Sequence, residues 1–323
     1  MSGGEFDLIA WIRQHSTPAG IVRVGIGDDC AVLAPEGPGE LLVTTDMLLD
    51  GRHFRLAEHD PADIARKALL VNLSDLAAMA GIPQAAVVAV ALPIDAPGGP
   101  QRLGRALHAA LAQAASEYSV VLAGGDTNAW RGPLVLSVTL IGQATPPGPV
   151  LRAGARPGDV LFVTGSLGGS LLGRHLRPSP RVAEGVALRR ELGVQLHAMI
   201  DISDGLAVDL GHILAESGGL GATLEAEAIP THRDAVALGA EDGRSPLEHA
   251  LHDGEDFELC LAVEAAAADR LADGLFADRS LALHRIGTVE AEPGLRLRHG
   301  DGRVEVIEPL GFDHFRPTPG VSP

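Results

Sequence analysis

The stretch Gly25–Leu33, GIGDDCAVL, places two adjacent carboxylates, Asp28 and Asp29, between a Gly-Ile-Gly turn and a short apolar run. Adjacent aspartates repel each other, and neither can enter a packed core without a partner for its charge. A glycine-bracketed acidic pair is therefore typical of a site that holds a cation. The rest of the chain must then supply further ligands.

The amino-acid composition excludes several classes of protein. The chain has 323 residues, of which 46% are apolar and 21% charged, enough for two domains or one large one with a sizeable core. A net charge of −17 argues against binding to nucleic acid or to an anionic membrane surface. The two cysteines, Cys30 and Cys260, form neither a disulfide framework nor a CxxC zinc site, which fits a reducing compartment.

No segment reads as a targeting or membrane signal. The N-terminus carries an acidic residue where a signal peptide would be basic. The longest clean apolar run, Ala85–Leu92, is far below the roughly 20 residues of a membrane span. We expect a cytoplasmic protein that does not bind membranes.

In the first half, apolar spacing and turn residues predict alternating helices and strands. Asp60-Pro61 is a typical helix start, and the helix is expected to end at Gly81 and to be buried on most sides. Further helices are expected over Glu5–His15 and Gly99–Glu117. The strands are expected over Leu41–Thr45 (ending at Asp46), Ala85–Leu92, Val120–Ala123 (ending in the GGDT sequence) and Pro133–Gln143.

The Pro- and Gly-rich segment Ala144–Gly158 is the best candidate for a domain boundary, so we expect domains over residues 1–148 and 149–323. The glycine-rich turn Gly165–Ser170, GSLGGS, is expected to lead into a helix. Further helices are expected over Pro180–Leu192, Leu206–Ser217 and Glu264–Phe276. Strands are expected over Val160–Thr164, Met199–Ile202, Phe257–Val263, Ala282–Val289 and Leu295–Ile307. The fold class is α/β, with two domains of related style.

Acidic residues recur beside glycine turns and at strand ends or on the buried helix: Asp28, Asp29, Asp46, Asp75, Asp126, Asp201 and Asp204. Hydroxyl groups accompany them at Thr44, Thr45, Thr127 and Ser203. Carboxylate and hydroxyl oxygens without His or Cys suit Mg²⁺ rather than zinc, and several carboxylates together suggest a multi-metal site that clamps a polyphosphate. The alternative for any single aspartate is an ordinary turn or cap residue.

Other patterns limit the chemistry. A P-loop is absent, so any nucleotide site is of another type. GSLGGS is either an anion-binding nest of amides or a plain tight turn. His249 and His252 are expected on a surface helix rather than in a metal site. The residues alone thus favour a Mg²⁺–nucleotide site for phosphoryl transfer and leave the acceptor open.

A series of motifs carries a resemblance that runs from Glu5 to Phe315. In order they are GEF, GIGDDCAVL, TTDML, GRHF, ARKALLVNLSDLAAMAG, GGDT, RAGARPGD, LRPSPR, IDISDGL, GEDFEL and GFDHF. Together they resemble the thiamine-monophosphate kinase family, within the aminoimidazole ribonucleotide synthetase-like superfamily. The resemblance implies two α/β domains and a homodimer that pairs the sheets of the N-terminal domains. It implies several Mg²⁺ ions and direct in-line transfer from ATP to thiamine phosphate, giving thiamine diphosphate without a phosphoenzyme.

The resemblance also implies roles for particular residues. The implied metal ligands are Asp29, Thr44, Thr45, Asp46, Asp75, Asp126, Asp201 and Asp204. The implied ATP contacts are Gly125, Asp126, Arg152 and Ser203, and the implied thiamine phosphate contacts are His53, Glu255 and Phe312. Asp28 is expected to support the turn. The alternatives are another ATP-using enzyme of the superfamily, or a homologue that binds ATP and Mg²⁺ without catalysis.

Overall fold

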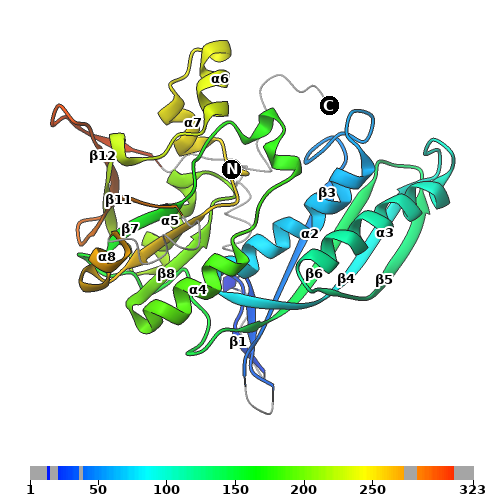
Figure 1. The fold of residues 1–323 in the computed structure, drawn as a ribbon, viewed down its shortest axis with the longest axis horizontal. Coiled ribbons are helices and arrows are strands. Elements are labelled where there is room, and N and C mark those ends of the chain that lie inside the picture. Colours follow the sequence, from blue (N-terminus) through cyan, green and yellow to red (C-terminus); the bar gives the residue numbers. More distant parts are fainter. Residues whose placement is uncertain (1–12, 15–20, 36–38, 273–281, 309–323) are drawn as a thin grey trace.

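The computed structural model describes residues 13–14, 21–35, 39–272 and 282–308. They form two sheets with helices packed on them (Figure 1). Most of the helix expected over residues 5–15 falls outside these ranges, as does Phe312. The sheets span residues 22–144 and 160–307, and the division of the chain at residue 148 stays a prediction.

The first sheet has six strands in the order β1-β2-β3-β6-β4-β5. Neighbours run antiparallel, except β4 and β5, which are parallel. In chain order the strands are β1 (Val22–Val24), β2 (Ala31–Leu33), β3 (Leu41–Leu49), β4 (Gly81–Pro93), β5 (Val121–Trp130) and β6 (Val135–Ala144).

Two helices, α2 (Pro61–Ala78) and α3 (Pro100–Glu117), lie on the same face of this sheet (Figure 1). The predicted start of α2 is confirmed: the Asp60 side chain accepts a hydrogen bond from the Ala62 amide, and Pro61 occupies the first turn. Helix α2 is buried along most of its length because it packs on the first sheet and α3 and also contacts α4 and β8 of the second half. One helix therefore contacts both halves of the molecule.

The second sheet has seven strands in the order β13-β12-β9-β11-β7-β10-β8. They are β7 (Val160–Thr164), β8 (Leu196–Asp201), β9 (Gly221–Glu225), β10 (Leu259–Val263), β11 (Leu283–Glu290), β12 (Gly294–Arg298) and β13 (Val304–Ile307). The interior strand β7, between β11 and β10, is buried throughout, as expected where both faces of a sheet are covered. It matches the predicted strand residue for residue.

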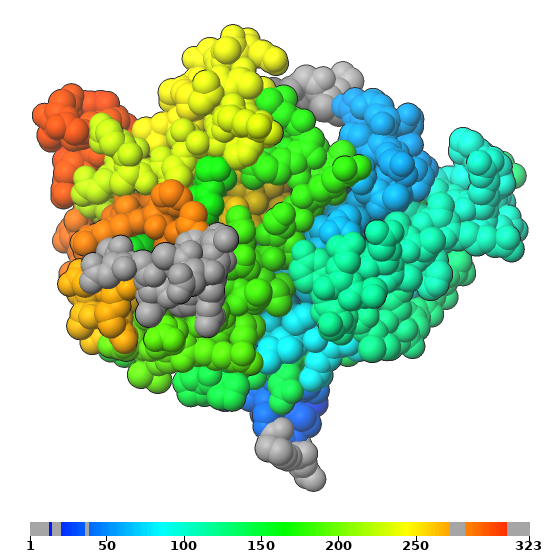
Figure 2. Space-filling model, viewed as in Figure 1, coloured from blue at the N-terminus to red at the C-terminus, as the bar shows by residue number. Residues whose placement is uncertain are grey.

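Alternate residues of β7 pack into two different cores. Leu161 and Val163 face α5 (Leu206–Glu216) and α7 (Pro246–His252). Val160 and Phe162 face α4 (Val182–Leu192), α8 (Ala265–Ala272) and the end of α2. This alternation is the period of two that a strand imposes on its side chains. A further helix, α6 (Arg233–Asp242), precedes α7, and Figure 2 shows the two together at the top of the molecule.

Several predicted boundaries are wrong. Helix α2 ends at Ala78 rather than at Gly81, where β4 already begins, and β8 begins at Leu196 rather than at Met199. Two strands also extend past their predicted ends. Strand β3 continues through Asp46 to Leu49, and β5 continues through GGDT to Trp130. Each pairs with a long neighbour over its whole length, so the ladder extends the strand past its glycine or polar residues. In β5 the glycines allow a close approach, since a Cβ on Gly125 would lie 1.8 Å from the carbonyl oxygen of Val88.

Two further expectations in the second half are corrected. The 165–170 turn leads into two short 3₁₀ turns, η1 (Ser170–Leu172) and η2 (Arg174–Leu176), rather than a helix, because Gly173 between them has φ +125°. The strand expected over 295–307 is a hairpin of β12 and β13. Strand β9 and helix α6 were not predicted. Among the described helices, none is both long and apolar enough to cross a bilayer.

Candidate metal and substrate site

Three aspartates from distant parts of the chain meet between the two halves. Asp29 lies between β1 and β2, Asp75 on α2, and Asp201 at the end of β8. Each offers a carboxylate oxygen, and these oxygens all lie within 4.8 Å of one another. Asp46 of β3 joins them through a hydrogen bond between its carboxyl group and that of Asp75. We call Asp29, Asp46, Asp75 and Asp201 the acid cluster.

The pKa values show that the acid cluster disfavours ionised carboxylates when no further cation is bound. Loss of solvation raises the pKa of Asp46 to about 6. Burial, followed by the neighbouring carboxylates, raises the pKa of Asp75 and of Asp201 well above its usual range. Hydroxyl donors offset only part of this: Thr44 Oγ1 lies 2.6 Å from Asp75 and Ser74 Oγ 2.6 Å from Asp201.

One arginine faces the acid cluster. Arg152 donates two hydrogen bonds to the Asp29 carboxylate, of 2.9 and 3.1 Å, in the bidentate geometry that guanidinium and carboxylate favour. Its backbone amide also donates to Asp28, at 3.2 Å. Burial and the adjacent Asp29 raise the pKa of Asp28 to about 7. In the described part of the chain, Arg152 is the one cationic side chain paired with the acid cluster.

When all four carboxyl groups are ionised, one guanidinium leaves an excess of negative charge that a further cation would balance. The donors are all oxygens, and the set lacks histidine and thiolate, which fits Mg²⁺ better than zinc. The acid cluster thus fits a magnesium site by the chemistry of its donors. It is built from both halves and exists only when they are docked.

Asp204 and Ser203 lie next to the acid cluster in the loop before α5. The buried carboxylate of Asp209 accepts hydrogen bonds of 3.0–3.1 Å from the backbone amides of residues 203, 204 and 205. Asp209 therefore fixes the loop that follows Asp201. Sequence reasoning placed Asp209 on the helix but assigned it no role.

Two predicted ligands lie away from the acid cluster in this chain. Thr45 points to the opposite face of β3 from Thr44, where its hydroxyl contacts the Val138 carbonyl and Thr139. Asp126 lies on β5, which is exposed along most of its length, and Asn128 donates to it at 2.7 Å. Strand β5 is separated from β3 by β6 and β4, three strand spacings or about 14 Å. Gly125 shares this position on the edge strand.

Two of the predicted thiamine phosphate contacts, His53 and Glu255, lie at the other end of α2. The ammonium group of Lys67 donates to the backbone carbonyl of His53 at 3.0 Å and to the Glu255 carboxylate at 2.7 Å. The Lys67 side chain is fully buried. Sequence reasoning missed Lys67, although a signal exists: it is the sole lysine among 25 Lys and Arg residues. Eight residues of α2, about 12 Å, separate it from Asp75.

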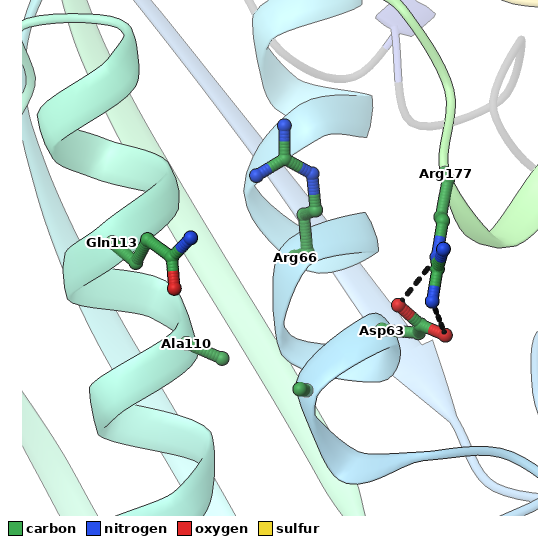
Figure 3. A pocket seen from close by; sticks show the side chains of 6 residues that line it. Asp63, Arg66, Ala110, Gln113 and Arg177 are labelled. Atoms are coloured by element: carbon green, nitrogen blue, oxygen red, sulfur yellow. Dashed lines mark hydrogen bonds and ion pairs between the residues drawn. The ribbon is translucent and has the colours of Figure 1, made fainter.

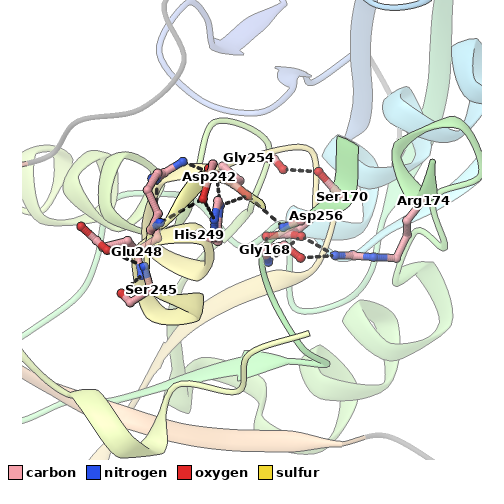
Figure 4. A network of polar contacts seen from close by, with 12 residues as sticks. Gly168, Ser170, Arg174, Asp242, Ser245, Glu248, His249, Gly254 and Asp256 are labelled. Atoms are coloured by element: carbon pink, nitrogen blue, oxygen red, sulfur yellow. Dashed lines mark hydrogen bonds and ion pairs between the residues drawn. The ribbon is translucent and has the colours of Figure 1, made fainter. Parts of the chain in front are cut away.

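The loop that carries Glu255 is held by a second group of charges (Figure 4). Asp253 accepts from His249 at 2.9 Å, Arg244 at 3.1 Å and the Gly169 amide at 2.9 Å. Asp256 accepts from Arg174 and from the Gly168 amide, both at 2.9 Å. We call this set, consisting of Asp242, Asp253, Asp256, Arg174, Arg244 and His249, the loop network.

The contacts of the loop network test two of the predictions made from the sequence. The amides of GSLGGS already bind the protein's own carboxylates, which favours the tight turn over an anion nest for a ligand. His249 is fully buried between Asp253 and Asp242, so its placement on a surface helix was wrong. Carboxylates on both sides allow the imidazole to be buried.

A cavity of about 250 Å³ lies apart from these groups, between α2, α3 and the segment after η2 (Figure 3). Arg66 and Arg177 line it, and each pairs with a carboxylate, Glu117 and Asp63 respectively. None of the predicted site residues lines this cavity.

Comparisons with known proteins agree with this architecture. Residues 27–144 match the model of the AIR synthase related protein N-terminal domain, and residues 156–300 match that of the C-terminal domain. A thiamine-monophosphate kinase of Rhodopirellula baltica is 41% identical over 321 residues, covering 96% of this chain and 97% of the relative. That of Salmonella typhimurium is 38% identical over 339 residues, covering 98% and 99%. The solved structure "AaThiL complexed with AMPPCP and TMP" has a TM-score of 0.80 at 30% identity, with 97% of each chain covered.

Proposed function

The chain belongs to the thiamine-monophosphate kinases of the AIR synthase related family, and we propose that it transfers a phosphoryl group from ATP to thiamine phosphate. The products are thiamine diphosphate and ADP. The observation that carries the proposal is the acid cluster, an oxygen-only donor set with excess negative charge at the junction of the two halves. Such a set suits Mg²⁺ that is shared with a polyphosphate.

Several residues would hold the magnesium. Asp29, Asp75 and Asp201 offer oxygens close enough to share ions, and Asp46 and Thr44 are hydrogen-bonded to Asp75. Asp204 follows Asp201 by three residues and is a further proposed ligand. When bound, Mg²⁺ would neutralise the charge of two polyanions that otherwise repel each other. Arg152, held by Asp29, is placed to offer a positive charge to a phosphate at the same location.

The transfer needs no strong base. An oxygen of the thiamine phosphate group, already anionic, forms a bond to the γ-phosphorus of ATP as the bond from that phosphorus to the ADP oxygen breaks. The task of the chain is to hold the two phosphates in line. Ser203, in the loop fixed by Asp209, and Arg152 are the proposed ATP contacts from this chain.

At the other end of α2, His53 and Glu255 are the proposed contacts for thiamine. Thiamine carries a flat, cationic ring system, which suits a carboxylate. The Glu255 side chain is 24% exposed, so a ligand can reach it. Phe312, also proposed for this contact, lies outside the described residues.

We also propose a homodimer through the first sheet. The face of β3 opposite α2 is exposed at Met47 (57%), and the edge strand β5 is exposed at Val121 (65%). Unpaired strand edges and uncovered apolar faces favour pairing with another sheet. Since Asp126 and Gly125 lie about 14 Å from β3 in their own sheet, they are proposed to serve the acid cluster of a second copy.

The test is an assay of the purified protein with Mg²⁺, ATP and thiamine phosphate. Equal amounts of ADP and thiamine diphosphate are expected, and none with EDTA. Formylglycinamidine ribonucleotide and selenide, offered instead of thiamine phosphate, test for another enzyme of the superfamily. ATP binding by calorimetry without any product would point to a non-catalytic homologue and overturn the proposal. Light scattering gives the oligomeric state.

A further inference from the structure

Lys67 is the sole lysine of the chain, and it is fully buried. The other 24 basic residues, by subtraction from 25 Lys and Arg, are arginines. A buried ammonium group must have partners, and Lys67 has one from each half of the molecule. These are the His53 carbonyl of the first half and the Glu255 carboxylate of the second. It therefore joins the two halves at the proposed thiamine end of the site.

The main chain at Glu255 is held in a strained conformation. Glu255 has φ +51° and Phe257 has φ +54°, values that non-glycine residues adopt rarely. Hydrogen bonds fix this backbone: the Glu255 amide donates to the Ser203 carbonyl at 2.7 Å, and the Phe257 amide to the Ile202 carbonyl at 2.8 Å. The backbone is thus anchored in the second half, whereas the carboxylate is held by Lys67 from the first half.

The surroundings of Lys67 fit a compact cation. The ring of His175, edge-on to His59 at 6.2 Å, lies close by, and its pKa is held below the usual value by burial and by the Lys67 ammonium. An ammonium group is a small point charge with three donors, whereas a guanidinium is a broad planar fork. In a fully buried position with a carbonyl and a carboxylate as partners, the smaller group fits and the fork does not.

We propose that Lys67 is a positioning residue for the thiamine end of the site: it fixes the Glu255 carboxylate and the turn at His53 so that both meet the substrate. This inference rests on the proposed function. Lys67 acts through Glu255 and does not touch the reacting phosphates, which lie about two turns of α2 away at Asp75. Its loss should therefore affect thiamine phosphate and leave ATP alone.

The first test is a kinetic cycle of three variants, Lys67→Met, Glu255→Gln and the double variant. Lys67→Met should raise KM for thiamine phosphate by about tenfold or more, with KM for ATP within about twofold of wild type. Because Lys67 acts through Glu255, the double variant should be no worse than the more severe of the two single variants. The matched control is Arg66→Met, the neighbouring residue on α2, which pairs with Glu117 and should leave both KM values unchanged.

Two outcomes would overturn the inference: equal increases in both KM values, or effects of the two substitutions that multiply. Lys67→Arg should not restore the wild-type KM, because the fork cannot meet both partners. A wild-type protein that forms no thiamine diphosphate would instead disprove the proposed function, so the two failures are distinct.

A second test uses wild-type protein and does not depend on whether the variants fold. Selective ¹⁵N-lysine labelling gives a single side-chain ammonium signal in NMR, since the chain has one lysine. Thiamine phosphate should shift this signal, and ADP with Mg²⁺ alone should leave it in place. The inference would be contradicted if thiamine phosphate did not shift the signal, or if ADP with Mg²⁺ shifted it by the same amount.

Discussion

The acid cluster and the loop network both contain aspartates that are largely removed from solvent, Asp253 and Asp256 in the loop network, yet their charges are balanced differently. In the loop network each carboxylate has donors from the chain itself, including Arg174, Arg244 and His249. In the acid cluster, four carboxylates share Arg152 and two hydroxyl donors. The carboxylates of the loop network are balanced by donors of the chain itself, whereas the acid cluster fits a cation bound from solution.

This difference distinguishes aspartates that stabilise the fold from aspartates that serve a ligand. A buried carboxylate with a full set of donors stabilises the fold, and removing its charge leaves the donors without a partner. A buried carboxylate facing other carboxylates destabilises the metal-free fold, and removing its charge relieves repulsion. The same substitution, Asp to Asn, should therefore have opposite effects on stability in the two groups.

The largest effect is expected for Asp75→Asn in the acid cluster. Loss of this carboxylate should lower kcat/KM by about a thousandfold or more, because the phosphates can no longer be held together. The metal-free variant should unfold at a higher temperature than metal-free wild type at about pH 8. Enzyme assays and thermal unfolding followed by circular dichroism measure the two quantities. Full activity in this variant would remove Asp75 from the metal site.

The converse is expected for Asp253→Asn in the loop network. The amide would face the donors of His249, Arg244 and Gly169, so the free energy of unfolding should fall by about 2–4 kcal/mol. Urea denaturation measures this change, with Asp269→Asn on the exposed side of α8 as the control. A variant as stable as wild type would show that the loop network does not stabilise the fold.

A smaller effect is expected from pH. The pKa of Asp28 is about 7 and that of Asp46 about 6 when folded, against about 3.9 in an unfolded chain. Between about pH 4 and pH 7 the folded state binds more protons than the unfolded chain does. The free energy of unfolding therefore falls as pH rises through this range. The melting temperature of metal-free protein should fall by a few degrees between about pH 5 and pH 8. Mg²⁺ should raise the melting temperature more at about pH 8 than at about pH 5. An equal rise at both pH values would contradict the excess of negative charge in the acid cluster.

The smallest effect is expected at the cavity between α2 and α3. Arg177→Ala removes an exposed ion pair with Asp63, and exposed pairs contribute little. Both KM values and the unfolding midpoint should match wild type. A clear rise in either KM would assign the cavity a part in catalysis.

Sequence reasoning succeeded where local chemistry decides the structure. Asp60-Pro61 set the start of α2, and the uninterrupted apolar run at 160–164 set a buried strand. It also grouped Asp29, Asp75 and Asp201, which the fold brings within 4.8 Å of one another. Each of these signals lies within a few residues of chain or within a recognisable motif.

Sequence reasoning failed where the environment of a residue depends on partners that are distant in the sequence. Asp126 was expected at the end of a strand, whereas it lies within β5, which pairs with β4 along its whole length. His249 reads as a surface residue until Asp242 and Asp253 flank it. Lys67 was assigned no role from the sequence, because its partner Glu255 lies 188 residues away. Pairings of this kind depend on tertiary packing, which overrides local pattern.

Helix α2 has a consequence for how this protein can vary in length. Lys67 is bonded to Glu255 of the second half, and a carboxylate oxygen of Asp75 lies within 4.8 Å of one of Asp201. The α-helix between Lys67 and Asp75 fixes their separation and their angle. Inserting or deleting one residue would rotate one anchor by about 100° relative to the other and shift it by about 1.5 Å. The segment between them can therefore exchange apolar side chains of similar volume, but it tolerates no change in the number of its residues.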